Sequence, residues 1–170
     1  MIVTMSTSNT HSDDNQKLLT LIKDIRVAMM TTFTADGGLH TRPMWTQNPD
    51  DAEPGTLWFM TQLDSAKVQE LEARPVIHVT YSDLGSNNYV SVRGAGDVVR
   101  DPERIKEMWN IHAKAWFPNG PDDPNLGLIR VRTEHAEYWD GPSKPAYALS
   151  LLKAVVTGER PYGGEHRVVR

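Results

Sequence analysis

The chain has 170 residues, 39% of them hydrophobic and 24% charged, with a net charge of -4 at pH 7, which predicts one ordinary globular domain. The acidic balance argues against nucleic acid as the main partner, because binding to a phosphate backbone requires a basic surface. The chain has no cysteine, no secretory signal and no stretch of the ~18 apolar residues that cross a membrane, so we expect a cytoplasmic protein without disulfides or thiolate metal sites.

The N-terminal third predicts a helix followed by a β-hairpin. We expect a disordered tail over residues 1–15 that gives way, around Asp13–Ile25, to an amphipathic helix capped by Asp13. Two strands should follow, over Val27–Thr34 and Leu39–Trp45. The Asp-Gly-Gly turn between them predicts an antiparallel pair.

The second strand of this hairpin carries an unusual run, Arg42-Pro43-Met44-Trp45. Proline cannot donate a hydrogen bond within a sheet, so Pro43 belongs at an edge or a bulge, where backbone can meet a ligand. Alternation along the strand puts Arg42 on the same face as His40 and Met44. The alternative is an edge strand that ends in a solvated arginine.

The stretch Leu57–Pro75 predicts a strand followed by a helix. Between them lie Thr61, Ser65 and Lys67, whose hydroxyls and ammonium group adjoin the unpaired N–H groups of a helix N-terminus. This combination is typical of an anion site, and phosphate is the expected ligand. The alternative is that Asp64 or Ser65 only caps the helix while Lys67 faces water.

The remaining chain predicts more strands, two helices, an aromatic loop and a C-terminal tail. These are strands over Val76–Tyr81, Tyr89–Val99 with a bend at its glycines, and Leu126–Asp140; a helix from Asp101 through His112; an aromatic loop at 116–124; a helix over Ala146–Thr157; and a last dozen residues that are loosely ordered or bound to a partner subunit. About six strands joined mostly by hairpins favour an antiparallel barrel with helical plugs over a βαβ arrangement.

Familiar catalytic and metal-binding patterns are missing. The six histidines do not occur at the spacings of metal ligands, so we predict no metal site. Neither a serine-hydrolase elbow nor a phosphate-binding glycine loop is present, and no catalytic acid or base can be assigned. Any chemistry would therefore come from a bound organic cofactor.

Four stretches, in matching order and spacing, resemble the FMN-binding split barrels typified by pyridoxamine 5'-phosphate oxidase, and within them the bacterial general stress proteins. They are VAMMTTFTADGGLHTRPMW, LWFMTQLDSAKVQELEARPVIHVTY, YVSVRGAGDVVRDPERIKEMW and WFPNGPDDPNLGLIRVRTEHAEYWDG. The resemblance implies a six-stranded antiparallel split barrel over about residues 16–141. Residues 142–170 would be a C-terminal helix and tail, within the same domain or in contact with a dimer partner.

The resemblance also implies a homodimer that binds FMN, or alternatively FAD, in the groove between its subunits. The positions matching Arg42, Ser65 and Lys67 would hold the flavin phosphate, and those matching Pro43, Met44, Trp45, Met60 and Thr61 would border the ring. Trp116 and Trp139 are candidates to cover the ring from the partner subunit, or else core or dimer contacts.

Two departures from the oxidase bear on function. Ala66 stands where the oxidase has a second basic residue, which implies a weaker or exchangeable flavin, and the C-terminal tail lacks recognisable residues for the oxidase's substrate. We therefore expect an FMN-dependent oxidoreductase of the general stress type that passes electrons between a reduced nicotinamide and a small acceptor. The alternatives are a flavin-binding or flavin-storing stress protein without turnover, and an enzyme using deazaflavin or haem on the same fold.

Overall fold

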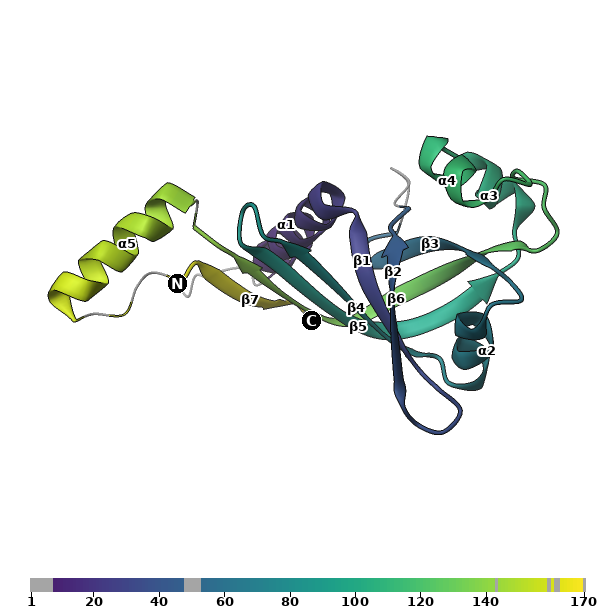
Figure 1. Cartoon of the computed structure of the whole chain (residues 1–170), viewed down its shortest axis with the longest axis horizontal. Coiled ribbons are helices and arrows are strands. Elements are labelled where there is room, and N and C mark those ends of the chain that lie inside the picture. The colour runs from purple at the N-terminus through teal and green to yellow at the C-terminus, as the bar shows by residue number, and fades with distance from the viewer. Residues whose placement is uncertain (1–7, 48–52, 143, 159, 161–162, 170) are drawn as a thin grey trace, which may run out of the picture.

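The computed structural model describes residues 8–47, 53–142, 144–158, 160 and 163–169, and within them the chain forms an antiparallel sheet with peripheral helices (Figure 1). The elements in chain order are α1 (Ser8–Ile25), β1 (Val27–Phe33), β2 (Leu39–Trp45), β3 (Thr56–Gln62), α2 (Ala66–Ala73), β4 (Val76–Asp83), β5 (Asn88–Val99), α3 (Pro102–Glu107), α4 (Ile111–Trp116), β6 (Leu126–Asp140), α5 (Lys144–Thr157) and β7 (Glu165–Val169). The strand order is β2-β1-β4-β5-β6-β3, and β7 pairs with β6 outside this path. None of the described helices is both long and apolar enough to cross a membrane.

The predicted hairpin is confirmed, with Val27 opposite Trp45 and Phe33 opposite Leu39. In β1 the buried side chains alternate with exposed or half-buried ones, so one face of the strand packs on the core. The core-facing residues are Ala28, Met30 and Thr32.

The sheet is not closed, and the described residues form seven strands rather than the predicted six. Among the described residues, its two end strands, β2 and β3, are linked by an isolated bridge between Thr46, just after β2, and Phe59. Beside this bridge the Gln47 N–H donates to the Trp58 carbonyl at 2.7 Å. Strand β6 pairs with β5 along one edge, and the two halves of its other edge have different neighbours. The first half pairs with β3, and the second half pairs with β7.

Strand β7 corrects the prediction for the end of the chain. Glu165–Val169 pairs with Ala136–Asp140 instead of remaining loosely ordered. The sequence signal was weak, because a strand of five residues following glycines shows little periodicity.

Two predicted helices have different limits in the structure. The first begins at Ser8, so Asp13 lies inside it rather than at its cap, and the expected tail over residues 1–15 is helical from Ser8 onward. The helix predicted from Asp101 through His112 is two short helices, α3 and α4. The Asn110 side chain accepts hydrogen bonds from the backbone N–H groups of His112 and Ala113 and so starts a new helix.

Strand β3 is buried on both faces, which explains its short, continuously apolar sequence. Leu57 and Phe59 face the main core between the sheet, α1 and α2. Trp58 and Met60 face a second cluster formed with α3, α4 and the start of β6. This second cluster fixes α3 and α4 beside β3 and β6 (Figure 1).

The predicted bend in β5 is confirmed as a register shift between Arg93 and Gly94. A side chain at Gly94 would collide with the Arg132 carbonyl, so glycine is required where the two strands approach at the bulge. Gly96 serves another contact. A Cβ atom there would lie 2.9 Å from Leu71 Cδ2, so its absence allows α2 to pack closely on the sheet.

Helix α5 projects away from the sheet (Figure 1). It begins at Lys144 rather than at the predicted Ala146, and it ends at Thr157. Gly158 terminates it, as predicted, with φ at +71° and its N–H donating to the Ala154 carbonyl at 2.8 Å. Its apolar side chains are nevertheless exposed, including Leu149, Leu152, Val155 and Val156.

Candidate functional site

A cavity of about 340 Å³ lies between β2, the end of β3, the start of α2 and helix α4. Its lining is mostly apolar or aromatic, and Lys67 is the one lysine or arginine among the lining residues. The residues that line it are Val27, Pro43, Met44, Trp45, Gln47, Met60, Thr61, Gln62, Lys67, His112, Ala113, Trp116 and Phe117. A mostly apolar pocket with a few polar groups is the common form of an organic ligand site.

One wall of the cavity is built from α4. The His112 ring stacks on the Trp45 ring, with centroids 4.1 Å apart and planes inclined by 21°. The Asn110 side-chain N–H donates to Gln47 Oε1 at 2.7 Å and ties the start of α4 to the end of β2. Trp116, at the end of the helix, is 75% exposed although it lines the cavity. The cavity thus carries a large aromatic surface open to solvent.

Lys67 lies in the first turn of α2, half-buried at the cavity. Loss of water around the ammonium lowers its pKa, and the positive charge of Arg42 lowers it further. The carboxylates of Glu70 and Asp64 act in the opposite direction. The ammonium therefore lies in an environment that favours the approach of an anion.

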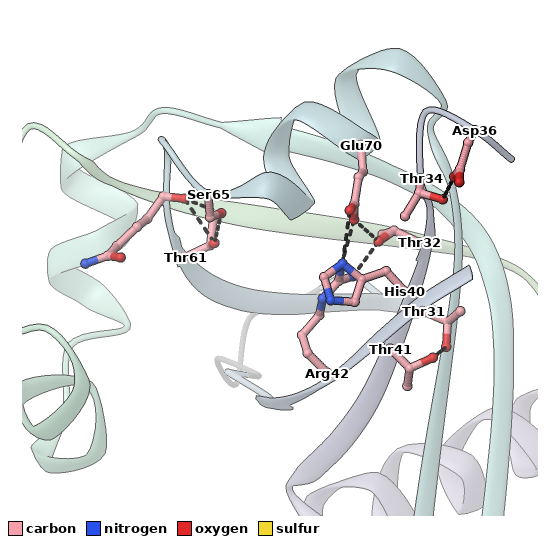
Figure 2. A network of polar contacts seen from close by, with 11 residues as sticks. Thr31, Thr32, Thr34, Asp36, His40, Thr41, Arg42, Thr61, Ser65 and Glu70 are labelled. Atoms are coloured by element: carbon pink, nitrogen blue, oxygen red, sulfur yellow. Dashed lines mark hydrogen bonds and ion pairs between the residues drawn. The ribbon is translucent and has the colours of Figure 1, made fainter. Parts of the chain in front are cut away.

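Arg42 is held by a polar network between α2 and the β1–β2 hairpin (Figure 2). Its Nη2 donates to Glu70 Oε2 at 2.7 Å, and its Nη1 donates to Thr32 Oγ1. Thr32 Oγ1 in turn donates to Glu70 Oε2 at 2.5 Å, and His40 Nδ1 lies 3.1 Å from Glu70 Oε1. The side chains of Arg42 and Glu70 are 14% and 11% exposed, so this ion pair is largely shielded from water.

The pKa of Glu70 reflects this network. Desolvation acts to raise it, but hydrogen bonds from Thr32, His40 and Arg42, together with the charge of Arg42, outweigh that effect and lower the pKa from 4.5 to about 2. Glu70 is therefore a carboxylate anion at neutral pH.

Thr61 and Ser65 lie where β3 passes into α2. Their hydroxyl oxygens are 3.3 Å apart, and Ser65 Oγ donates to the Gln62 carbonyl at 2.7 Å. Ser65 is the N-cap residue of α2, but its side chain makes no capping hydrogen bond. The Ser65 side chain therefore does not act as a helix cap, which was the alternative interpretation of this residue.

Trp139 lies away from the cavity. Thr61 pairs with Gly127 at the start of β6, whereas Trp139 is near the other end of that strand, where its ring stacks on His166 of β7 with centroids 4.8 Å apart. The twelve residues from Gly127 to Trp139 correspond to roughly 40 Å of extended strand. Within one chain, Trp139 cannot join the other predicted residues.

The structure thus brings most of the predicted site residues together. Those that line the cavity are Pro43, Met44, Trp45, Met60, Thr61, Lys67 and Trp116. Ser65 contacts the lining residue Thr61, and Arg42 acts electrostatically on Lys67, although neither is itself a lining residue.

Sequence reasoning missed Glu70 and the α4 wall. Glu70 had one available signal, since it lies three residues after Lys67 and hence on the same face of a helix. Its contact with Arg42 spans 28 positions and depends on how α2 packs on the sheet. The described residues contain no group of three histidine, aspartate or glutamate side chains able to hold a metal ion.

Comparison with known proteins identifies the family. Residues 13–162 match the family described as pyridoxamine 5'-phosphate oxidase like. The chain belongs to this family. The general stress protein 26 structure from Jannaschia sp. CCS1 is 28% identical and superposes with a TM-score of 0.75, covering 94% of this chain and 98% of that one.

Two further relatives extend the picture. The structure of the general stress FMN/FAD binding protein from Xanthomonas citri is 30% identical with a TM-score of 0.67, covering 78% of this chain and 92% of that one. Protein bli-3 of Neurospora crassa is 31% identical over 121 residues, which are 66% of this chain and 58% of the relative's length. The chain is thus similar to general stress proteins, one of which is named for binding FMN or FAD.

Proposed function

We propose that the chain binds FMN in the cavity between β2, β3 and α4, as a homodimeric split-barrel protein of the general stress type. The observation that carries this proposal is the combination of an aromatic cavity with Lys67 at its edge and Arg42 nearby. A flavin has the matching shape, a flat aromatic ring joined through a ribityl chain to a phosphate.

In this proposal the residues divide into two groups. Pro43, Met44, Trp45 and Met60 border the ring, where apolar contacts and stacking exclude water. Thr61, Ser65, Lys67 and Arg42 hold the phosphate, since hydroxyls, an ammonium and a guanidinium are its usual partners. The same site would accept the FMN portion of FAD.

Bound flavin would supply two-electron chemistry, so the first candidate activity is electron transfer between a reduced nicotinamide and a small acceptor. The second candidate is flavin binding without turnover. No carboxylate is among the described residues that line the cavity; the groups there that can exchange a proton are the Lys67 ammonium and the His112 imidazole, whose ring is stacked on Trp45.

The exposed apolar surface of α5 supports the homodimer. A helix with apolar residues on all sides is normally buried, yet Leu149, Leu152 and Val155 are each more than two-thirds exposed. A second copy of the chain would cover them. In such a dimer, Trp139, which is 37% exposed, would reach the cavity of the partner subunit. The absence of cysteine fits a cytoplasmic location.

The visible spectrum of the purified protein tests flavin binding. We expect a yellow protein, or a colourless one that takes up added FMN with quenching of flavin fluorescence. A protein that fails to take up FMN contradicts the proposal. With flavin bound, steady-state oxidation of NADH or NADPH separates the oxidoreductase from the binding protein, and sedimentation equilibrium of the same sample tests the dimer.

A further inference from the structure

Glu70 is an anion built into the proposed phosphate site. It extends from α2 toward the hairpin, where one carboxylate oxygen meets both Arg42 and Thr32 and the other meets His40 (Figure 2). Its side chain is only 11% exposed, so water screens its charge poorly. An arriving phosphate would meet this negative charge as well as the two cations.

The cations of the site are unequally compensated. Arg42 is paired with Glu70, whereas Lys67, one turn earlier on the same helix, forms no ion pair with any residue that the structure describes. Arg42, Lys67 and Glu70 together carry one net positive charge, and the carboxylate of Asp64, which also acts on Lys67, offsets it. A flavin phosphate near neutral pH carries almost two negative charges, so the site is under-compensated toward its ligand.

We propose that Glu70 sets the affinity of the phosphate site, positioning Arg42 and at the same time repelling the phosphate, so that the flavin remains exchangeable. This inference rests on the proposed binding of FMN and extends it. Glu70 acts through Arg42 and through its own charge.

The repulsion should outweigh the benefit of positioning. The hydrogen bonds to Thr32 and Glu70 use two of the five N–H donors of the Arg42 guanidinium, so others remain available for a phosphate. Thr32 would continue to hold Nη1 if the carboxylate charge were removed. Glutamine at position 70 would keep a carbonyl oxygen for Arg42 and lose only the charge.

The test is the affinity of Glu70→Gln for FMN and for riboflavin, measured by fluorescence titration of apoprotein. Riboflavin has the same ring but no phosphate, so its affinity does not depend on the charge at the phosphate site. We expect Glu70→Gln to bind FMN about tenfold more tightly and riboflavin unchanged, the scale of one partly shielded charge interaction.

Glu72→Gln is the matched control. Glu72 lies on the same helix and also pairs with an arginine, Arg100 at 3.1 Å, but its side chain is 51% exposed. The substitution removes the same charge from α2. We expect it to leave both affinities unchanged.

The outcomes separate this inference from the proposed function. Wild-type protein that binds neither flavin overturns both, and equal affinities for FMN and riboflavin in the wild type and in Glu70→Gln alike overturn the phosphate site and with it the role of Glu70. A wild-type preference for FMN that Glu70→Gln leaves unchanged or weakens overturns the role of Glu70 alone. If Glu70→Gln does not fold, Glu70→Ala removes the same charge with a good helix former, and the same readings apply.

Discussion

Among the described residues, one arginine–carboxylate cluster surrounds Glu70 and another surrounds Asp97. In the first, Glu70 bonds Arg42, and both side chains are largely buried. In the second, Asp97 accepts hydrogen bonds from Arg130 and Arg132 between β5 and β6, where the three side chains are 31%, 36% and 50% exposed. The second cluster has more guanidinium groups and yet is more open to solvent.

The difference shows that ion pairing alone does not mark a site. In both clusters desolvation acts to raise the carboxyl pKa and is outweighed, so the pKa is lowered: by hydrogen bonds from Thr32, His40 and Arg42 at Glu70, and by hydrogen bonds from Arg132 and Arg130 at Asp97. Only the Glu70 cluster adjoins an apolar cavity and a half-buried lysine, Lys67. Charges near an apolar cavity interact strongly with a ligand, whereas exposed charges are screened by water and salt.

The largest expected difference between the clusters concerns FMN. Replacing Arg42 and Lys67 together with alanine should cost ~3 to 6 kcal/mol of binding free energy, on the scale of two charge-assisted phosphate contacts. Replacing Arg130 and Arg132 with alanine removes the same charge and should leave FMN affinity unchanged. Fluorescence titration measures both, and equal effects of the two double variants would contradict the proposed phosphate site.

The second difference concerns folding stability. Arg42→Ala leaves Glu70 as a poorly solvated carboxylate without its arginine, which should lower the free energy of unfolding by about 1 to 3 kcal/mol. Arg132→Ala leaves Asp97 paired with Arg130 and open to water, so its effect should stay below ~1 kcal/mol. Urea denaturation of the apoproteins measures both, and a larger loss for Arg132→Ala would reverse the comparison.

The smallest difference is in the acid range. Because the pKa of Glu70 is lowered on folding, its carboxylate stabilises the folded state fully above pH 4.5, and that contribution is lost as the pH falls toward about 2. The stability advantage of wild type over Glu70→Gln should therefore shrink as the pH falls through this interval. Asp97→Asn should show a weaker dependence, because Asp97 is more exposed, and thermal unfolding at a series of pH values compares them.

Local features of the fold were predictable from the sequence. The composition of β1 and the turn after it predicted the antiparallel hairpin with β2, and the glycine pair in β5 predicted the bend. These signals act over a few residues. The split of the α3–α4 segment was missed because one side chain, Asn110, started a second helix within a continuous apolar pattern.

The candidate site was only partly predictable, because tertiary packing completes it. The grouping of Met44, Met60 and Lys67 followed from family resemblance and is what the cavity contains. The partner of Arg42 could not be read from local pattern, because it depends on how closely α2 packs over Gly96. Trp139 is separated from the cavity by the length of β6, a distance that no residue preference encodes.

The stretch that contains α5 leaves and re-enters the sheet at one place, because Asp140 at the end of β6 pairs with Glu165 at the start of β7. Two strands that meet in this way can be joined by a short turn, and lengthening such a connection costs little chain entropy. The pairing of β6 with β7 therefore places no demand on the length or the apolar character of the intervening helix. The sequence of α5 can therefore change to suit a partner while the cavity at the other end of β6 keeps its shape.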